Sequence, residues 1–370
     1  MRTRIGATAA FLAAATSVVC AVPAYAQNPP VGGDLLGSRG LVRPEGVKAP
    51  PKTKATSYVI AEAGSGDVLA AKDAHGRYLP ASTLKALTAL TLIPKLDPAL
   101  RVKPSATAVN QEGSAVGLVS KPLYKVDDLF RALMMSSGND AAMALAEVNG
   151  GLAKTLQDMN AVAHRLQAND TVAKTPSGLD KPGQSSSAYD LALIARAGLR
   201  NPAFARYIST KVSRFPAPKK WYEISNHNKL LWNYKGMVGV KNGWTSKAQG
   251  TFVGAATRNG KTIIVAIMRH EGYFWNEVAD LLDWGFAASG KVVPVGRLVE
   301  PLPDTPAVPP AAAAPSPSAS AVAAPLLDAA AGMQDGGSRT AGLAVIGGGL
   351  LFGTVWLVYG LRRKRSRARS

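Results

Sequence analysis

The sequence predicts an α+β domain with one antiparallel sheet, covering helices and a helical subdomain inserted between the strands. Alternating apolar patterns typical of strands occur at residues 58–70 and return only at residues 238–268. The stretch between them, to about residue 199, has helical periodicity. Strands at both ends of a helical middle indicate a single sheet whose strands are separated in the sequence by an inserted helical subdomain.

Two β-hairpins are predicted at the ends of this region. The strands are expected at residues 58–60, 68–70, 238–241, 251–257 and 262–268. The first two flank the turn sequence GSGD at residues 64–67. The last two are joined by residues 258–261, whose Asn-Gly centre is the strongest short-range hairpin signal in the chain.

Helices are predicted between and after these strands. They are expected at residues 130–135, 141–148, 189–199 and 275–288, and one more begins after Pro80 and carries Ser82 and Lys85. Residues 136–140 interrupt the first two, and Asn139 or Asp140 can cap the helix that follows. The last helix has apolar residues on one face, as packing on a sheet requires.

The first 54 residues predict export and a flexible lead. Residues 1–26 resemble a secretory signal peptide, because Arg2 and Arg4 precede an apolar run and a small-residue cleavage pattern. A retained membrane helix is the weaker alternative, since the apolar run is short. Residues 27–54 are rich in Pro and Gly and are expected to be flexible, ahead of a domain at residues 55–296. Cys20 is the one cysteine, so the mature chain would have no disulfide.

The C-terminal part predicts a tether and a membrane anchor. Residues 297–340 are rich in Pro, Ala and Ser and read as a semi-extended linker. Residues 341–361 form an uncharged, mostly apolar run of bilayer-spanning length, and a basic cytoplasmic tail follows at residues 362–370. We therefore expect a single-pass protein of the cell membrane whose domain lies on the extracytoplasmic, cell-wall side.

The chain has a formal net charge of +19. A basic tail directly behind a spanning helix is explained by topology, so no nucleic-acid partner is expected. The basic exported part suits an anionic environment, such as wall polymers or lipid headgroups.

The stretch PASTLKALTAL predicts a nucleophile and its base. Lys85 follows Ser82 by three residues, so on a helix the hydroxyl and the amine share a face. Burial lowers the pKa of a lysine and leaves a neutral amine that can take a proton from serine. Ser82 is therefore the expected nucleophile and Lys85 its base. An exposed lysine on an ordinary helix is the alternative that this pair alone leaves open.

Two further motifs offer polar groups to a cleft. SGN at residues 137–139 lies at an inter-helix turn, where Ser137 can relay a proton and Asn139 can bind a substrate carbonyl. A helix-capping turn is the alternative. KNGWT at residues 241–245 lies at the end of a predicted strand, where Lys241 supplies positive charge and the amide after the glycine can donate to an oxyanion.

Taken together and in this order, the three motifs resemble the signature set of penicillin-binding proteins and serine β-lactamases. The chain is similar to low-molecular-mass serine D-alanyl-D-alanine carboxypeptidases over about residues 55–288. Further matching stretches are MMSSGNDAAMALAE, TPSGLDKPGQSSSAYDLALIARA, SNHNKLLW, GVKNGWTSKAQGTFVGAA and LLDWGF. The resemblance implies the penicillin-binding/serine β-lactamase-like fold.

The resemblance also implies a reaction. Ser82 would attack the penultimate D-Ala carbonyl of a peptidoglycan stem peptide ending in D-Ala-D-Ala, with Lys85 as base. The backbone amides of Ser82 and Trp244 would form the oxyanion hole, and water would hydrolyse the acyl-enzyme. β-Lactam antibiotics would acylate Ser82 in the same way.

Other roles follow from the same resemblance. Ser137 and Lys241 would help to pass a proton to the departing D-Ala, and Asn139 would position the substrate amide. The chain departs from the family pattern at Asn242, where threonine is usual and commonly meets the substrate carboxylate. Thr245 is the residue that could take over this contact.

Several alternatives remain at this stage. A D,D-endopeptidase or transpeptidase acting on cross-links would share the same residues, and a non-catalytic penicillin-binding wall scaffold would keep the fold. A β-lactamase of class A needs a Glu-x-x-Leu-Asn loop that this sequence lacks. No cofactor or metal is expected, since the histidines at positions 75, 164, 227 and 270 are dispersed and show no ligand pairing.

Overall fold

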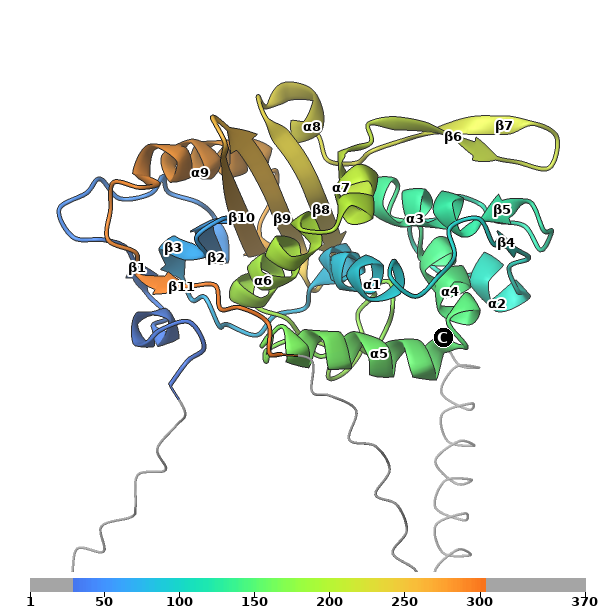
Figure 1. Cartoon of the computed structure of the whole chain (residues 1–370), viewed down its shortest axis with the longest axis horizontal. Coiled ribbons are helices and arrows are strands. Elements are labelled where there is room, and N and C mark those ends of the chain that lie inside the picture. The colour runs from blue at the N-terminus through green and yellow to red at the C-terminus, as the bar shows by residue number, and fades with distance from the viewer. Residues whose placement is uncertain (1–28, 304–370) are drawn as a thin grey trace, which may run out of the picture. The chain divides into compact units, whose positions relative to one another are not determined.

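A computed structural model describes residues 29–303 of the chain (Figure 1). The expected signal peptide, membrane span and basic tail, and the expected linker from residue 304 onward, lie outside the described residues. Within residues 29–303, no helix is both long enough and apolar enough to cross a bilayer.

A seven-stranded antiparallel sheet forms the centre of the domain, and its strand order is β1-β3-β2-β10-β9-β8, with β11 also paired to β3. The strands are β1 (Leu41–Val42), β2 (Ala55–Glu62), β3 (Asp67–Lys72), β8 (Met237–Thr245), β9 (Gln249–Arg258), β10 (Lys261–His270) and β11 (Gly296–Arg297). Both predicted hairpins are present. The β9–β10 turn has Asn259 and Gly260 at φ 50° and 74°, the left-handed values that a two-residue hairpin turn requires.

Helices and two small two-stranded sheets complete the fold. The helices are α1 (Lys85–Leu92), α2 (Ala106–Val109), α3 (Val126–Met135), α4 (Asn139–Val148), α5 (Leu152–Arg165), α6 (Ala188–Leu199), α7 (Pro202–Ser209), α8 (Leu230–Asn233) and α9 (Trp275–Ala288), with 3-10 turns η1 (Asp34–Gly37) and η2 (Ala81–Leu84). The predicted helices are thereby confirmed. The two-stranded sheet of β4 (Arg101–Val102) and β5 (Tyr124–Lys125) and the hairpin of β6 (Val212–Pro216) and β7 (Trp221–Ser225) were not predicted.

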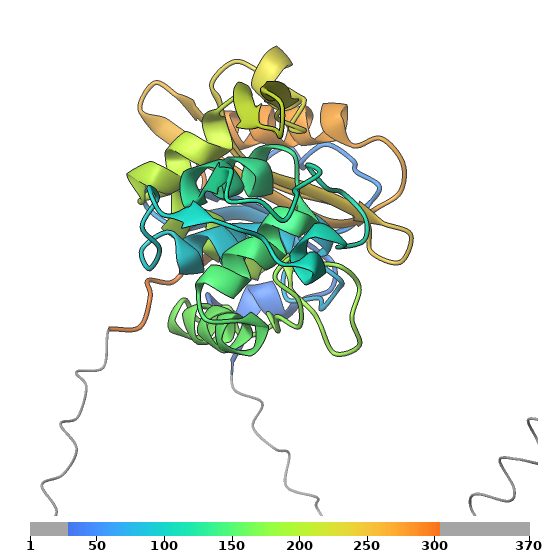
Figure 2. The same cartoon turned by 90° about the vertical axis from the view of Figure 1, so that its right-hand side faces the viewer.

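The sheet is covered by helices on both faces, which confirms the α+β class. α9 packs on one face and α6 and α1 on the other, and the two hydrophobic clusters of the core lie between these layers. Residues 263–268 of β10 are fully buried, as expected of a strand covered on both sides. Figure 2 shows the helices of the inserted subdomain from the side, in front of the sheet.

The prediction of a flexible lead is wrong for residues 34–42, which contain the 3-10 turn η1 and strand β1. β1 pairs with β3, with Leu41 opposite Lys72, and Leu36 of η1 is only 1% exposed. At the other end, β11 pairs with β3, so the ordered unit also continues past residue 296. Strands of two residues carry too short a pattern to be recognised in a Pro- and Gly-rich sequence.

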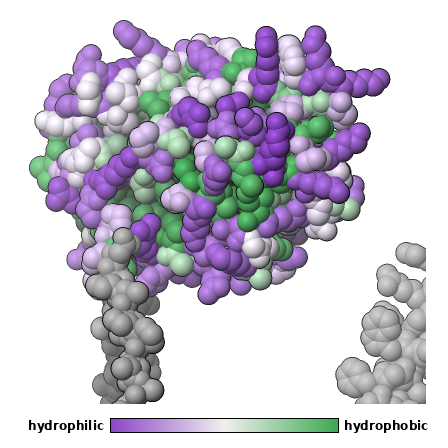
Figure 3. Space-filling model, turned by 45° about the vertical axis from the view of Figure 1, so that its right-hand side comes forward, coloured by the Kyte–Doolittle hydropathy of each residue, from purple (hydrophilic) through white to green (hydrophobic). Residues whose placement is uncertain are grey.

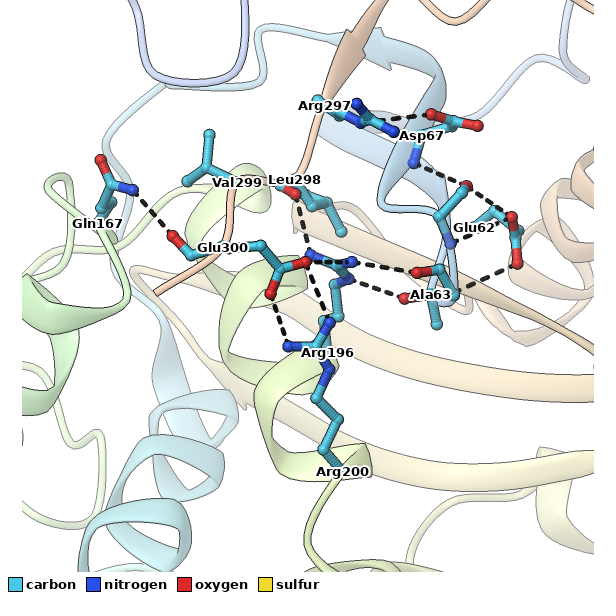
Figure 4. Close-up of polar contacts among 12 residues, drawn as sticks. Glu62, Ala63, Asp67, Gln167, Arg196, Arg200, Arg297, Leu298, Val299 and Glu300 are labelled. Atoms are coloured by element: carbon cyan, nitrogen blue, oxygen red, sulfur yellow. Dashed lines mark hydrogen bonds and ion pairs between the residues drawn. The ribbon is translucent and has the colours of Figure 1, made fainter. Parts of the chain in front are cut away.

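A buried arginine fixes the C-terminal segment (Figure 4). Arg196 of α6 is 5% exposed and donates to the backbone oxygens of Ala63 and Leu298 at 2.8 and 3.0 Å. It also forms an ion pair of 2.7 Å with Glu300, and the more exposed Arg200 donates to both carboxylate oxygens of Glu300. Because this guanidinium joins the β2–β3 turn to residues 298–300, it positions the end of the domain.

One face of the surface has an apolar area with polar side chains around it. Figure 3 shows a face on which hydrophobic residues gather toward the middle, surrounded by hydrophilic side chains. Single exposed apolar residues are ordinary on a protein surface, but gathered ones mark places where other molecules bind.

Candidate active site

Ser82 and Lys85 lie where η2 passes into α1, beside edge strand β8. The Lys85 Nζ atom is 3.1 Å from Ser82 Oγ, so the contact expected from the sequence is present. Ser82 belongs to the 3-10 turn, in which side chains three residues apart lie directly above one another. The preceding Ala81 has a φ of 47°, in the left-handed region that residues with a side chain rarely adopt.

The surroundings of Lys85 favour a neutral amine. The side chain is fully buried, and its Nζ also contacts Asn139 Oδ1 and the Ser177 carbonyl oxygen, both at 2.6 Å. Burial, and then the positive charge of Lys241, lower the pKa of Lys85 well below its ordinary value. A neutral amine can donate to both carbonyl oxygens and still offer its lone pair to the Ser82 hydroxyl. This arrangement can take a proton from Ser82.

Asn139 holds Lys85 in place. Its Oδ1 accepts from Lys85, and its Nδ2 donates to the backbone oxygen of Glu112 at 2.6 Å. The prediction that Asn139 or Asp140 caps α4 is wrong, because Gly138 is the N-cap residue and has no side-chain cap. Asp140 instead accepts two loop amides at 3.1 Å. Both side chains have tertiary partners, which local capping rules do not foresee.

Lys241 lies inside edge strand β8, which runs further than the strand expected at residues 238–241. The strand continues through Thr245 and pairs with β9 along its length. Lys241 is 1% exposed, and its Nζ donates to the Asn242 carbonyl oxygen at 2.8 Å. Burial lowers its pKa to about 7. Two buried lysines thus lie close enough for the charge of one to affect the titration of the other.

Gly243 brings the edge strand against the nucleophile. A Cβ atom at this position would lie 2.5 Å from the Ser82 backbone nitrogen and 3.0 Å from Ala81 Cβ. A side chain would therefore push β8 away from the turn that carries Ser82. The glycine allows two backbone segments far apart in sequence to meet at the nucleophile.

Ser137 lies between α3 and α4 without joining the network around Lys85. It is 5% exposed and has a φ of 62°, so its backbone is held in the left-handed region. Over the described range 29–303, its hydroxyl forms no hydrogen bond with another residue of the chain. The hydroxyl therefore keeps its full capacity to bind a substrate or to relay a proton.

Trp244 and Thr245 complete the third motif. The Trp244 side chain is 69% exposed, so only its backbone is held by the sheet. The Thr245 hydroxyl donates to Asp180 Oδ1 at 3.0 Å and accepts the Ala248 amide at 2.9 Å. In the absence of substrate, the hydroxyl expected to meet a carboxylate is already bonded to a carboxylate of the chain itself.

Comparison with known proteins agrees with this geometry. Residues 45–272 match the D-alanyl-D-alanine carboxypeptidase family of peptidases. The chain belongs to this family. It is 40% identical to D-alanyl-D-alanine carboxypeptidase DacB2 of Mycobacterium tuberculosis, over 66% of this chain and 87% of that protein. It is 31% identical to the carboxypeptidase DacF of Bacillus subtilis, but over only 57% of the length of that protein.

Solved structures support the same assignment. A crystal structure of a D-alanyl-D-alanine carboxypeptidase from Mycobacterium tuberculosis superposes with a TM-score of 0.67 at 38% identity, covering 69% of this chain and 99% of that one. The Streptomyces K15 DD-transpeptidase superposes with a TM-score of 0.62 at 26% identity, covering 65% of this chain and 100% of that one. The penicillin-binding fold expected from the sequence is confirmed.

The Ser177 carbonyl of this carboxypeptidase is a site group that sequence reasoning missed. It accepts a hydrogen bond from Lys85, and the next residue, Gly178, lies against the nucleophile turn with a φ of 83°. A Cβ atom at Gly178 would lie 1.8 Å from the Ala81 backbone oxygen. The stretch TPSGLD matched the family, but residue types alone do not show which backbone carbonyl will accept a hydrogen bond from Lys85.

His75 is not isolated, although the sequence suggested dispersed histidines. Among the described residues, it forms one group with Asp170 and Asp190 whose ligand-type atoms lie within 4.8 Å of one another. Its Nδ1 is 2.7 Å from Asp170 Oδ2, and Arg77 Nε donates to the other Asp170 oxygen at 2.9 Å. Because Arg77 and His75 already bond to the two carboxylate oxygens of Asp170, we interpret this cluster as a polar network held by the Arg77–Asp170 ion pair.

Proposed function

We propose that this family member removes the terminal D-Ala from peptidoglycan stem peptides through an acyl-enzyme on Ser82. The observation that carries the proposal is the fully buried Lys85, with its Nζ 3.1 Å from the Ser82 hydroxyl oxygen. A buried lysine with two carbonyl acceptors and a lowered pKa is arranged as a base.

In the first step, Lys85 takes the proton of the Ser82 hydroxyl while Oγ forms a bond to the penultimate D-Ala carbonyl carbon. The carbonyl oxygen becomes an oxyanion, for which the backbone amides of Ser82 and Trp244 are the proposed donors. The close approach of β8 at Gly243, which brings these two backbone segments together, supports that assignment.

In the second step, the peptide C–N bond breaks and the terminal D-Ala leaves with a proton on its amine. Lys85 is the source of this proton, and Ser137 and Lys241 are proposed to relay it. Water then attacks the Ser82 ester, Lys85 again accepts a proton, and the Ser82 hydroxyl is restored when the peptide leaves. A β-lactam would form the same ester with Ser82 but would keep its leaving amine attached.

Substrate would lie along the free side of β8. Because β8 is the edge strand of the sheet, one side of its backbone is available to an extended peptide. Asn139 is proposed to contact the substrate amide, and Thr245 its terminal carboxylate. Thr245 must then exchange its bond with Asp180 for the substrate.

We further propose that the enzyme acts outside the cytoplasm while held in the cell membrane. Residues 1–26 would direct export, and residues 341–361 would span the bilayer ahead of the basic tail. The sequence pattern supports this proposal. Cell fractionation of the full chain and of a chain ending at residue 340 tests it, because only the full chain should stay in the membrane fraction.

The central experiment measures acylation and turnover on the full-length protein. Intact mass after incubation with benzylpenicillin should rise by the mass of the antibiotic, and Ser82→Ala should abolish the increase. D-Ala release from a diacyl-D-Ala-D-Ala peptide should be lost in the same variant. Absence of the mass increase in the wild-type protein would overturn the proposal.

A second function is favoured by one comparison, since a neighbour in structure is a DD-transpeptidase. Transpeptidation uses the same acyl-enzyme, but an amine replaces water as acceptor. Adding glycine as acceptor to the D-Ala-release assay separates the two reactions, because transfer to glycine gives a peptide that differs in mass from both the substrate and the hydrolysed product. A mass-resolved transfer product that exceeds the hydrolysed peptide would assign transpeptidation.

A further inference from the structure

Exposed aromatic rings and lysines gather beside the cleft. We call this group the rim patch, and it consists of Lys211, Lys229, Trp232, Trp244 and Tyr273. The three rings are 50%, 69% and 62% exposed in chain order. Exposed aromatic side chains that gather in one place are typical of binding surfaces.

The members of the rim patch are connected through α8 and its neighbours. Lys229 Nζ lies 5.2 Å from the centre of the Tyr273 ring, and the Trp232 amide donates to the Lys229 carbonyl oxygen at 3.1 Å. Lys211 Nζ lies 5.4 Å from the Trp232 ring centre. The cation–π contacts hold the lysines beside the rings while leaving half or more of each ring exposed.

A pocket links the rim patch to the nucleophile. Lys229 and Trp244 line an open pocket of about 480 Å³, together with Asn242 and Gly243 of the edge strand. Gly243 is the residue that lies against the Ser82 backbone. A substrate that reaches Ser82 along β8 and is long enough to continue past this strand would therefore meet the rim patch.

We propose that the rim patch binds the glycan chain of the peptidoglycan strand whose stem peptide enters the cleft. This inference rests on the proposed function. Sugar rings present apolar C–H faces that pack on aromatic rings, and the lysines suit the carboxylates of neighbouring lactyl and stem-peptide groups. A short peptide would meet the rim patch only at Trp244, whose backbone amide is a proposed oxyanion donor, so Trp232 and Tyr273 would distinguish a polymeric substrate from a soluble peptide.

Aromatic residues and lysines also occur where proteins lie on bilayers. The position of the rim patch argues for substrate instead, because contact of Trp244 and Lys229 with lipid would close the pocket that opens at Gly243. Glycan binding and lipid binding by the rim patch predict different results for the same variants.

The test compares two substrates on full-length protein in detergent micelles. One is a diacyl-D-Ala-D-Ala peptide, and the other is uncross-linked peptidoglycan strands with pentapeptide stems. For Trp232→Ala and Tyr273→Ala, we expect kcat/KM on the strands to fall about two- to tenfold per ring. D-Ala release from the short peptide and acylation by benzylpenicillin should stay unchanged.

Trp221→Ala is the matched control, because Trp221 is also exposed and has Arg214 packed 4.3 Å from its ring centre, but it lies in the β6–β7 hairpin and is not part of the rim patch. An equal loss on both substrates, no loss on strands, or the same loss in the control would overturn the inference. A loss seen only in phosphatidylglycerol vesicles would assign the rim patch to lipid and would also overturn it.

Binding measured without catalysis separates this inference from the proposed function. In the Ser82→Ala background, co-sedimentation with the strands should weaken when Trp232 and Tyr273 are replaced. If wild-type protein releases no D-Ala but this binding difference remains, the proposed function fails and the rim patch stands. If D-Ala is released but the binding difference is absent, only the inference on the rim patch fails.

Discussion

Replacing Lys241 by methionine should stabilise the fold while it removes activity. Lys241 is 1% exposed and its pKa is about 7, against about 10.4 in an unfolded chain. The unfolded chain therefore keeps a proton at pH 7 that the folded chain binds only half of the time, which costs folding about 4 kcal/mol. Methionine has a similar length and is not charged, so it avoids this cost.

The gain is reduced by one lost hydrogen bond. Lys241 donates to the Asn242 carbonyl oxygen, and leaving that acceptor without a partner costs about 1–2 kcal/mol. Lys241→Met should therefore be more stable than the wild type by about 2–3 kcal/mol at pH 7. For a domain of this size the melting temperature should rise by about 4–12 °C.

The difference in stability between Lys241→Met and the wild type should depend on pH. The folded-state pKa of Lys241 lies below the unfolded value, so the cost is fully present at and below pH 7 and disappears as the pH rises past about 10.4. The advantage of the variant should shrink over that range and should reverse by about 1 kcal/mol at its upper end. Urea unfolding followed by circular dichroism at several pH values measures it. A variant that is less stable at pH 7, or a gain that does not change with pH, would refute the reasoning.

Two further changes test contacts at either end of the domain. Asp180→Asn removes the negative charge to which Thr245 is bonded, so KM for a D-Ala-D-Ala peptide should fall about two- to fivefold with little change in kcat, and an unchanged or higher KM would contradict it. Arg196→Ala leaves buried carbonyl oxygens without a donor and should lower the free energy of unfolding by about 3–5 kcal/mol. Arg200 is more exposed, so Arg200→Ala should lower the free energy of unfolding by less than about 1 kcal/mol. Similar losses in the two variants would contradict the importance of the buried Arg196 contacts.

The sequence was informative where a local pattern decides the structure. The Asn259-Gly260 turn needs two left-handed residues, and the amphipathic pattern of residues 275–288 requires one covered face, so both were predicted correctly. The Ser82 and Lys85 contact follows from a spacing of three residues, which brings side chains together in a 3-10 turn as well as in an α-helix.

The missed features depend on contacts between distant segments. The Ser177 carbonyl reaches Lys85 because residues 175–179 fold over the nucleophile turn, and nothing in the local sequence states this. Asn139 and Asp140 are good helix-capping residues by type, but a buried amine and two loop amides bind them instead. β1 and β11 are too short to show a period, and both form because β3 offers a partner.

The placement of β1 and β11 has a mechanical consequence. Both pair with β3, while the catalytic strand β8 is at the opposite edge of the sheet. A pull on either end of the described chain would therefore load β3 and the Arg196 contacts first. Strands β2, β10 and β9 stand between that edge and Ser82. A force applied at the ends of the described chain would therefore reach the nucleophile only after the pairing with β3 had been broken.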